Sequence, residues 1–224
     1  MNPLAGAAAF FQGMAFIVST PRVWLRALVP IVTLLVLFAG FTALGILAAT
    51  VLTHGVLVVL LAVPAVVLAL LLAVSLAQPL SGWALDGIVR AQRQELGLPR
   101  LPTASTGAVM LSSLGSALLA LAIGTPLIAA LTVLGWVFPP AMVVTLPLKV
   151  LVGALVVAWD LVDYPLAMRG AVLGDRLRFA GRSFGSFLGF GLAATAFFAV
   201  PVLGLLALPC GVAGATRLTS RSGT

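Results

Sequence analysis

The sequence has very few of the residues from which enzymes and metal sites are built. Its 224 residues include one histidine, one cysteine, one tyrosine and five acidic residues. The histidine, His54, has no cysteine or carboxylate near it in sequence, which makes a metal site unfavourable. Cys210 has no second cysteine with which to form an internal disulfide. The sequence also lacks a Walker or dinucleotide-binding glycine pattern, so we expect no enzyme activity, no metal and no cofactor.

Charged residues are also scarce. Charged residues make up 8% of the chain and hydrophobic residues 62%, a composition outside the range of water-soluble domains. The chain carries no charge before Arg22, so it lacks the basic start of a signal peptide and we expect the whole chain to be retained. We therefore predict an all-α integral membrane protein in which residues 1–224 form a single membrane domain.

Positive charge nevertheless exceeds negative charge, with twelve lysines and arginines against five acidic residues and a formal net charge of +7. Such a balance can indicate a nucleic-acid partner, but these cations stand in clusters between apolar runs. They form no basic stripe interleaved with aromatic residues. We expect no nucleic-acid partner, and we interpret the cations as positive loops beside membrane spans.

Two long apolar runs, residues 31–53 and 55–77, organise the chain. Neither contains a charged residue, and each has the roughly twenty residues with which a helix crosses a hydrocarbon core of about 30 Å. We predict transmembrane helices over 22–53 and 55–77. His54 lies in the tight reversal between them, so the two helices run antiparallel.

Two amphipathic elements flank this pair. Residues 3–19 are uncharged and broadly apolar, and we predict an interfacial helix lying along the membrane. Thr20 and Pro21 then indicate a helix start, with Thr20 as N-cap. Residues 78–106 contain apolar positions at helical spacing opposite charged ones, which predicts an amphipathic surface segment.

Prolines interrupt the next apolar stretch, residues 107–159. It could make two crossings with a turn at Phe138-Pro139-Pro140, or a shallower hairpin of broken helices, and periodicity alone does not decide between them. The fold class that we predict includes it as the first of two proline-broken, partly penetrating hairpins. Residues 160–183 follow as a basic cytoplasmic loop.

The last apolar stretch, residues 184–216, is too short for two full crossings. A single crossing would place Arg217 and Arg221 on the side opposite the basic loop, against the positive-inside rule. We therefore predict a re-entrant hairpin that returns to its own side, with both termini cytoplasmic.

Motifs spread over nearly the whole chain resemble one known family. In the N-terminal part these are Phe11-Gln12-Gly13, Pro21 and Pro30, and in the C-terminal third Asp163-Tyr164-Pro165, Phe184-Gly185, Pro201, Pro209 and Gly214-Ala215-Thr216. In this order and spacing they resemble the CysZ sulfate-permease family, whose domain the etoposide-induced membrane proteins share. The resemblance implies a bacterial inner-membrane protein with two long spans, two partly penetrating hairpins and surface helices. It also implies homo-oligomers and passage of sulfate.

The resemblance also implies an anion site at the start of the first long helix, where the family has two adjacent arginines after a Pro-Gly step. Here Trp24 and Leu25 occupy those positions, and Arg22 and Arg26 flank them. Helix N-terminal amides and guanidinium groups suit an oxyanion, so Thr20, Arg22 and Arg26 are the candidate anion-binding residues. The alternative is that both arginines are positive-inside anchors of the first span.

Three further charged residues lie near or within apolar runs. An ammonium in hydrocarbon costs at least about 2.5 kcal/mol, so Lys149 either lines an anion pathway or snorkels to water. Asp160 and Asp163 share a helix face and could form an acid–base pair, or a structural pair at the membrane border. The family resemblance implies that Asp163 is a fold determinant, and we expect it to bond to backbone amides of a neighbouring hairpin. Its companions in the structural motif are Tyr164, Pro165, Pro201, Pro209, Gly214 and Thr216.

Together these features predict a passive permease or channel for sulfate or a related oxyanion, in the bacterial inner membrane. Its expected partners are the anion, membrane lipid and further copies of itself. The alternative is a non-transporting scaffold of the same fold that shapes membranes or supports other proteins.

Overall fold

The structure, a computed structural model, describes residues 2–52, 54, 80–101 and 106–221, together with ten positions between them. Those ten are residues 58, 61, 62, 65, 66, 68, 69, 72, 73 and 76. The elements in the described part are α1 (Pro3–Ser19), α2 (Pro21–Leu52), α4 (Gly82–Glu95), α5 (Thr106–Val137), a short 3-10 turn (Pro139–Ala141), α6 (Met142–Ala167), α7 (Leu173–Arg182), α8 (Phe184–Phe198) and α9 (Pro201–Arg221). All of them are helical, which confirms the predicted all-α fold.

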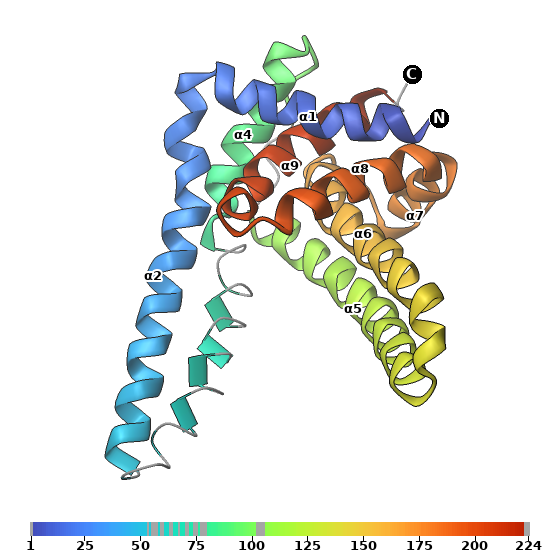
Figure 1. The fold of residues 1–224 in the computed structure, drawn as a ribbon. Helices are drawn as coiled ribbons and strands as arrows, with labels where there is room; N and C mark the ends of the chain where they lie inside the picture. Colours follow the sequence, from blue (N-terminus) through green and yellow to red (C-terminus); the bar gives the residue numbers. More distant parts are fainter. Residues whose placement is uncertain are drawn as a thin grey trace.

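Two described helices are long and apolar enough to cross a membrane, Pro21–Val51 and Pro139–Ala167. The first is α2, which extends away from the other helices (Figure 1). The predicted second span, 55–77, lies largely outside the described residues. Its described positions are helical, and a Cβ atom placed on Gly45 of α2 would lie 3.0 Å from the Cβ atom of Ala65.

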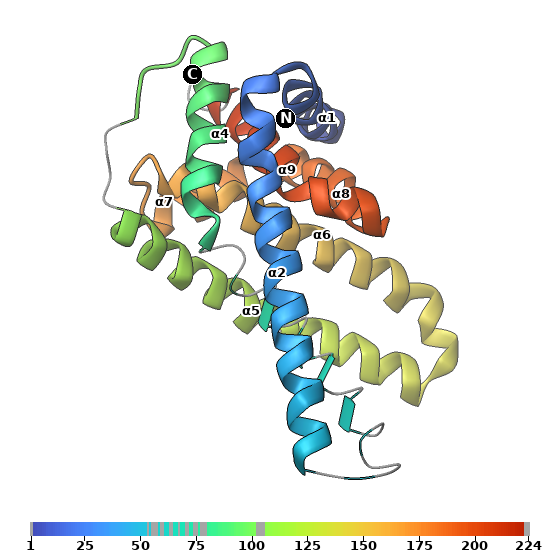
Figure 2. The same ribbon diagram turned by 90° about the vertical axis from the view of Figure 1, so that its left-hand side faces the viewer.

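The second long apolar helix, α6, belongs to the segment that we predicted as a hairpin of broken helices. That prediction is wrong at Pro126 and Pro147, which lie inside the continuous helices α5 and α6. The chain reverses at residues 138–141, where the two-crossing alternative placed its turn, and α5 and α6 then pack along each other (Figure 2). Proline inside an apolar helix removes one backbone hydrogen bond, and neighbouring helices and local adjustments compensate for it.

The predicted loop over 160–183 is also corrected, because most of it is helical. Helix α6 continues to Ala167, and α7 begins at Leu173 after a short connection. We predicted a loop here because the stretch is rich in charged residues and lies between two apolar runs. Amphipathic helices carry apolar and charged residues on different faces, so a high content of charge does not exclude a helix.

The core forms where α1 packs against α8 and α9. Phe10 of α1 is fully buried, and its ring makes edge-to-face contacts with Phe190 and Phe197 of α8 at centroid distances of 5.9 and 5.5 Å. Phe16 and Ile17 are buried as well. One face of α1 is therefore part of the protein core, while its opposite face stays exposed.

Glycine permits the close contact between α1 and the C-terminal helices. A Cβ atom on Gly13 would lie 2.2 Å from the backbone nitrogen of Gly214, and one on Gly6 would lie 1.8 Å from the carbonyl oxygen of Ser186. Real Cβ atoms do not approach backbone so closely, so only glycine fits. This explains why the motifs Phe11-Gln12-Gly13 and Gly214-Ala215-Thr216, from opposite ends of the chain, both contain glycine.

Candidate anion-binding site

The start of α2 carries the predicted anion-binding residues. Helix α2 begins at Pro21, directly after Thr20, and the side chains of Arg22 and Arg26 are exposed. Proline has no N–H group, and the amide of Val23 donates to the carbonyl of Thr20 at 3.0 Å. This helix start therefore offers fewer free amides than an ordinary helix N-terminus.

Arg26 also connects α2 to α4. Its Nη1 atom donates to the carbonyl oxygen of Gly87 at 3.3 Å. A Cβ atom on Gly87 would lie 2.6 Å from the Cδ atom of Arg26, so the absent side chain makes room for the arginine. This contact joins Arg26 to α4, whereas Arg22 has no such contact among the described hydrogen bonds.

Trp24, at a position where the resemblance implies an arginine, lies at the junction of α1 and α2. Its indole Nε1 donates to the carbonyl oxygen of Ile17 at 2.8 Å. Carbonyl groups at the end of a helix have no partner within that helix, so the indole satisfies one of them. The residue has a structural role where an anion-binding side chain was expected from the resemblance.

Lys149 lies elsewhere. It is half-buried near the start of α6, and its neighbours Leu148 and Val150 are exposed. The turn that precedes α6 points away from α1 and α4 (Figure 1). The structure therefore does not bring Lys149 to the arginines at the start of α2.

Asp163 has a buried partner that the sequence did not reveal. Its carboxylate pairs with the guanidinium group of Arg176 in α7, and the two side chains are only 6% and 4% exposed. Arg176 also donates from Nε to the carbonyl oxygen of Ala171 at 2.9 Å. Where we predicted bonds to backbone amides, the structure shows an ion pair that fixes α7 against α6.

Tyr164, the next residue, joins α6 to α4. Its hydroxyl oxygen lies 2.5 Å from Oδ1 of Asp86 and 2.7 Å from the carbonyl oxygen of Gly82. The single hydroxyl proton can be donated to one acceptor at a time, and the charged carboxylate is the stronger acceptor. The Asp-Tyr-Pro motif therefore holds two surface helices, α7 through Asp163 and α4 through Tyr164.

We expect Tyr164→Phe to lower the free energy of unfolding by about 1 to 2 kcal/mol, because a partly buried hydrogen bond to a carboxylate is lost. Thermal unfolding of the purified protein in detergent measures this. Thr50→Val is the matched control, since it removes an exposed bond from the Thr50 hydroxyl to the carbonyl of Leu47 within α2. Equal shifts for the two variants would contradict a role for Tyr164 in holding α4.

The other motif residues are structural as well. Pro165 and Pro209 are buried inside α6 and α9, and Pro201 is the first residue of α9. Thr216 is fully buried and donates from its hydroxyl to the carbonyl oxygen of Val212 at 2.8 Å. Together with the close approach at Gly214, these contacts shape the helix that faces α1.

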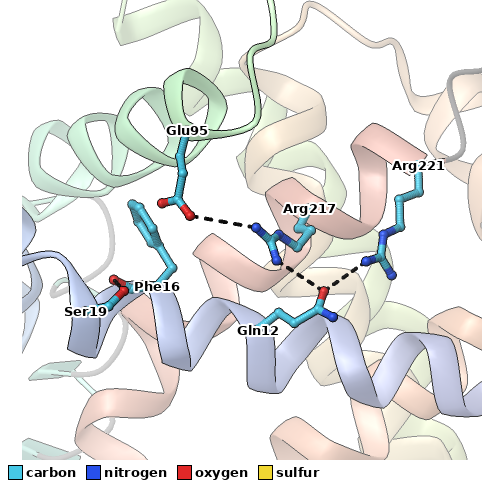
Figure 3. Close-up of polar contacts among 6 residues, drawn as sticks. All are labelled: Gln12, Phe16, Ser19, Glu95, Arg217 and Arg221. Carbon is cyan, nitrogen blue, oxygen red and sulfur yellow. Dashed lines mark hydrogen bonds and ion pairs between the residues drawn. The ribbon is translucent and has the colours of Figure 1, made fainter.

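A polar cluster that sequence reasoning missed lies where α1, α4 and α9 meet (Figure 3). The amide oxygen of Gln12 accepts from Nη1 of Arg217 at 3.4 Å and from Nη2 of Arg221 at 3.0 Å. The Nη2 atom of Arg217 lies 3.9 Å from Oε1 of Glu95. Two cations from α9 therefore converge on α1, with one carboxylate from α4 beside them.

Two more arginines belong to this region. Arg93 donates to the carbonyl oxygen of Pro99 at 2.9 Å. Arg169 donates to the carbonyl and hydroxyl oxygens of Thr219, each at 3.2 Å. Burial lowers the pKa of Arg93, and burial followed by the positive charge of Arg93 lowers the pKa of Arg169. We call Arg93, Arg169, Arg217 and Arg221 the C-terminal arginine cluster.

The sequence contained only part of the signal for this cluster. Arg217 and Arg221 are four residues apart, which places them on one helix face, but we used them only as markers of membrane topology. Gln12 is 205 residues from Arg217 in sequence. No local pattern predicts a contact over such a separation.

A family match covers most of the chain. The sequence model of the family described as Sulfate transporter CysZ/Etoposide-induced protein 2.4 matches residues 9–209. A search of curated proteins finds no match. The matched range includes the start of α2, the Asp163-Tyr164-Pro165 motif and Pro201, and it ends before Arg217.

Proposed function

Because the chain belongs to the Sulfate transporter CysZ/Etoposide-induced protein 2.4 family, we propose that it is a permease for sulfate or a closely related oxyanion. The family match over residues 9–209 is the observation on which this proposal depends. The family is of a transporter type and is not an enzyme family. The proposed flux is passive and driven by the gradient of the anion, since the sequence has no ATP-binding pattern.

The proposed entry site is the start of α2. Arg22 is exposed there and can offer a guanidinium fork to an oxyanion, with Thr20 beside it. Arg26 contributes a second positive charge, although its Nη1 atom is bonded to Gly87. Positive charge at the mouth of a path raises the local concentration of anions.

The arrangement of the C-terminal hairpin supports the proposed topology. The Ser186 hydroxyl at the start of α8 donates to the carbonyl of Asn2 at 3.0 Å, and Arg221 at the end of α9 bonds Gln12. Both ends of the hairpin therefore meet α1, which supports a hairpin that returns to its own side. We propose that both termini lie in the cytoplasm. We propose that several copies in the bacterial inner membrane enclose the path, with Lys149 as a candidate lining residue.

We expect the double variant Arg22→Gln/Arg26→Gln to take up labelled sulfate about tenfold more slowly than wild type in liposomes, because charge-assisted bonds to the anion are lost. Arg178→Gln is the matched control: it removes the same kind of charge from an exposed pair with Asp175 on α7. Uptake should not require ATP.

Two results would contradict the proposal. Wild-type protein that incorporates into liposomes but passes no sulfate would favour the scaffold function. Uptake by the double variant equal to that of the Arg178→Gln control would exclude the start of α2 as the entry site.

A further inference from the structure

The arginines of α9 converge on a neutral acceptor. Arg217 and Arg221 donate to the same uncharged oxygen, the Gln12 amide, although like charges repel each other at close range. The nearby carboxylate, Glu95, is 48% exposed and lies 3.9 Å from Arg217, whose side chain is 22% exposed. A contact of that length and exposure stabilises little.

Particular buried polar atoms on the helices that form this region have no hydrogen-bond partner. The Nε atoms of Arg93, Arg169 and Arg217 are buried without a hydrogen bond, and so are both polar side-chain atoms of Gln92. Gln92 is fully buried and lies three residues before Glu95, on the same face of α4. Buried polar groups are almost always bonded in folded proteins, so unpartnered donors around a cation pair indicate a place for an anion.

Several acceptors in the cluster are neutral oxygens, those of Gln12, Pro99 and Thr219. Other carboxylates of the chain have partners elsewhere: Asp163 pairs with Arg176, and Asp175 with Arg178. Among the described residues, the region around the end of α9 therefore carries more positive than negative charge, on side chains that reach the protein surface.

The position of Glu95 in α4 is unfavourable for a negatively charged side chain. It is the last residue of α4, where the partial negative charge of the helix end disfavours a carboxylate. Its side chain is half-exposed and can turn into solvent without disturbing the core. Glu95 is thus a weak internal ligand for Arg217 that a better anion can replace.

We propose that Arg217, Arg221 and Gln12 form a second oxyanion-binding site, at which a tetrahedral oxyanion displaces Glu95. Two guanidinium groups offer paired N–H donors to such an anion, and the Gln12 side chain can supply an amide N–H. The α9 arginines lie beyond the residues that the family sequence model matches, and the site is distinct from the start of α2. Only the choice of sulfate as probe rests on the proposed function; a lipid phosphate has the same chemistry.

Calorimetric titration of the purified protein with sodium sulfate, in neutral detergent at low ionic strength, tests the site. Glu95→Gln removes the competing carboxylate and is expected to tighten binding about three- to fivefold. Arg217→Gln is expected to weaken it about tenfold or more. Asp175→Asn, which breaks an exposed pair on α7, should leave the affinity unchanged. A purely structural role of the cluster would not make the Glu95 variant bind more tightly.

A second titration uses nanodiscs that contain phosphatidylcholine alone or mixed with phosphatidylglycerol. If lipid phosphate is the occupant, the two variants change phosphatidylglycerol binding in the same directions, and sulfate competes weakly. The proposal would be overturned if both variants bound sulfate and lipid with the affinity of wild type. If Arg217→Gln does not fold, the affinity of Glu95→Gln alone tests the proposal. Because binding is measured with Arg22 and Arg26 intact and without flux, absence of transport would leave this result unaffected.

Discussion

Asp163→Asn is expected to lower the free energy of unfolding by about 3 to 5 kcal/mol, because it leaves a buried arginine without its counter-ion. Arg176 and Asp163 are 4% and 6% exposed, so water cannot replace the lost carboxylate. Asparagine keeps the size of the side chain and removes only its charge. We expect α7 to detach from α6 first, which limited proteolysis between Met168 and Leu173 would detect alongside thermal unfolding in detergent.

A control variant and a rescue variant test this prediction. Asp175→Asn breaks the ion pair with Arg178, in which the arginine is 62% and the aspartate 52% exposed. It should lower the free energy of unfolding by less than about 1 kcal/mol. Replacing both buried partners, Asp163→Leu with Arg176→Met, should recover most of the stability, because no charge is then left buried. If Asp163→Asn destabilises no more than Asp175→Asn, the buried pair does not hold α7.

The second large effect is expected at Gly13, where alanine should destabilise the protein by about 3 kcal/mol, near the upper end for overpacking. The new methyl group would lie 2.2 Å from the nitrogen of Gly214 and 2.5 Å from the carbonyl oxygen of Cys210. Both are backbone atoms of α9 and cannot move aside as a flexible side chain can. The helices α1 and α9 would have to separate, which would also loosen the contact of Gln12 with Arg217.

Gly40→Ala provides the control with the opposite sign. Gly40 lies inside α2, and a Cβ atom added there would have nothing within 4 Å, so alanine should stabilise the helix by up to about 1 kcal/mol through its higher helix propensity. Melting temperatures of the two variants in the same detergent give the comparison. A Gly13→Ala protein as stable as wild type would refute the close approach of α1 and α9.

These contacts give a physical account of the family motifs. Gly13 and Gly214 permit two helices from opposite ends of the chain to touch, while Asp163 and Tyr164 fix α7 and α4 to the end of α6. The motif residues thus position the surface helices. Arg22 and the α9 arginines, the cations to which we assign anion binding, lie on the scaffold that these contacts build.

The sequence by itself determined that this is an all-α membrane protein. The length of an apolar run and the absence of charge within it are local properties, and a helix is the structure that satisfies its own backbone in a membrane interior. The same local reasoning failed over residues 160–183, where charge suggested a loop and the chain forms the end of α6 and all of α7. Charge marks contact with water or with a partner, and it does not by itself end a helix.

Only the tertiary structure decided which polar groups meet. Tyr164 and Asp86 are 78 residues apart, and Gln12 and Arg221 are 209 apart. Such contacts depend on how whole helices pack, and packing is set jointly by glycine contacts and buried rings across the fold. The arginine that pairs with Asp163 and the arginines that converge on Gln12 look alike in the sequence. Burial beside a carboxylate gives the first a structural role, whereas we propose that the arginines that donate to Gln12 can receive an anion.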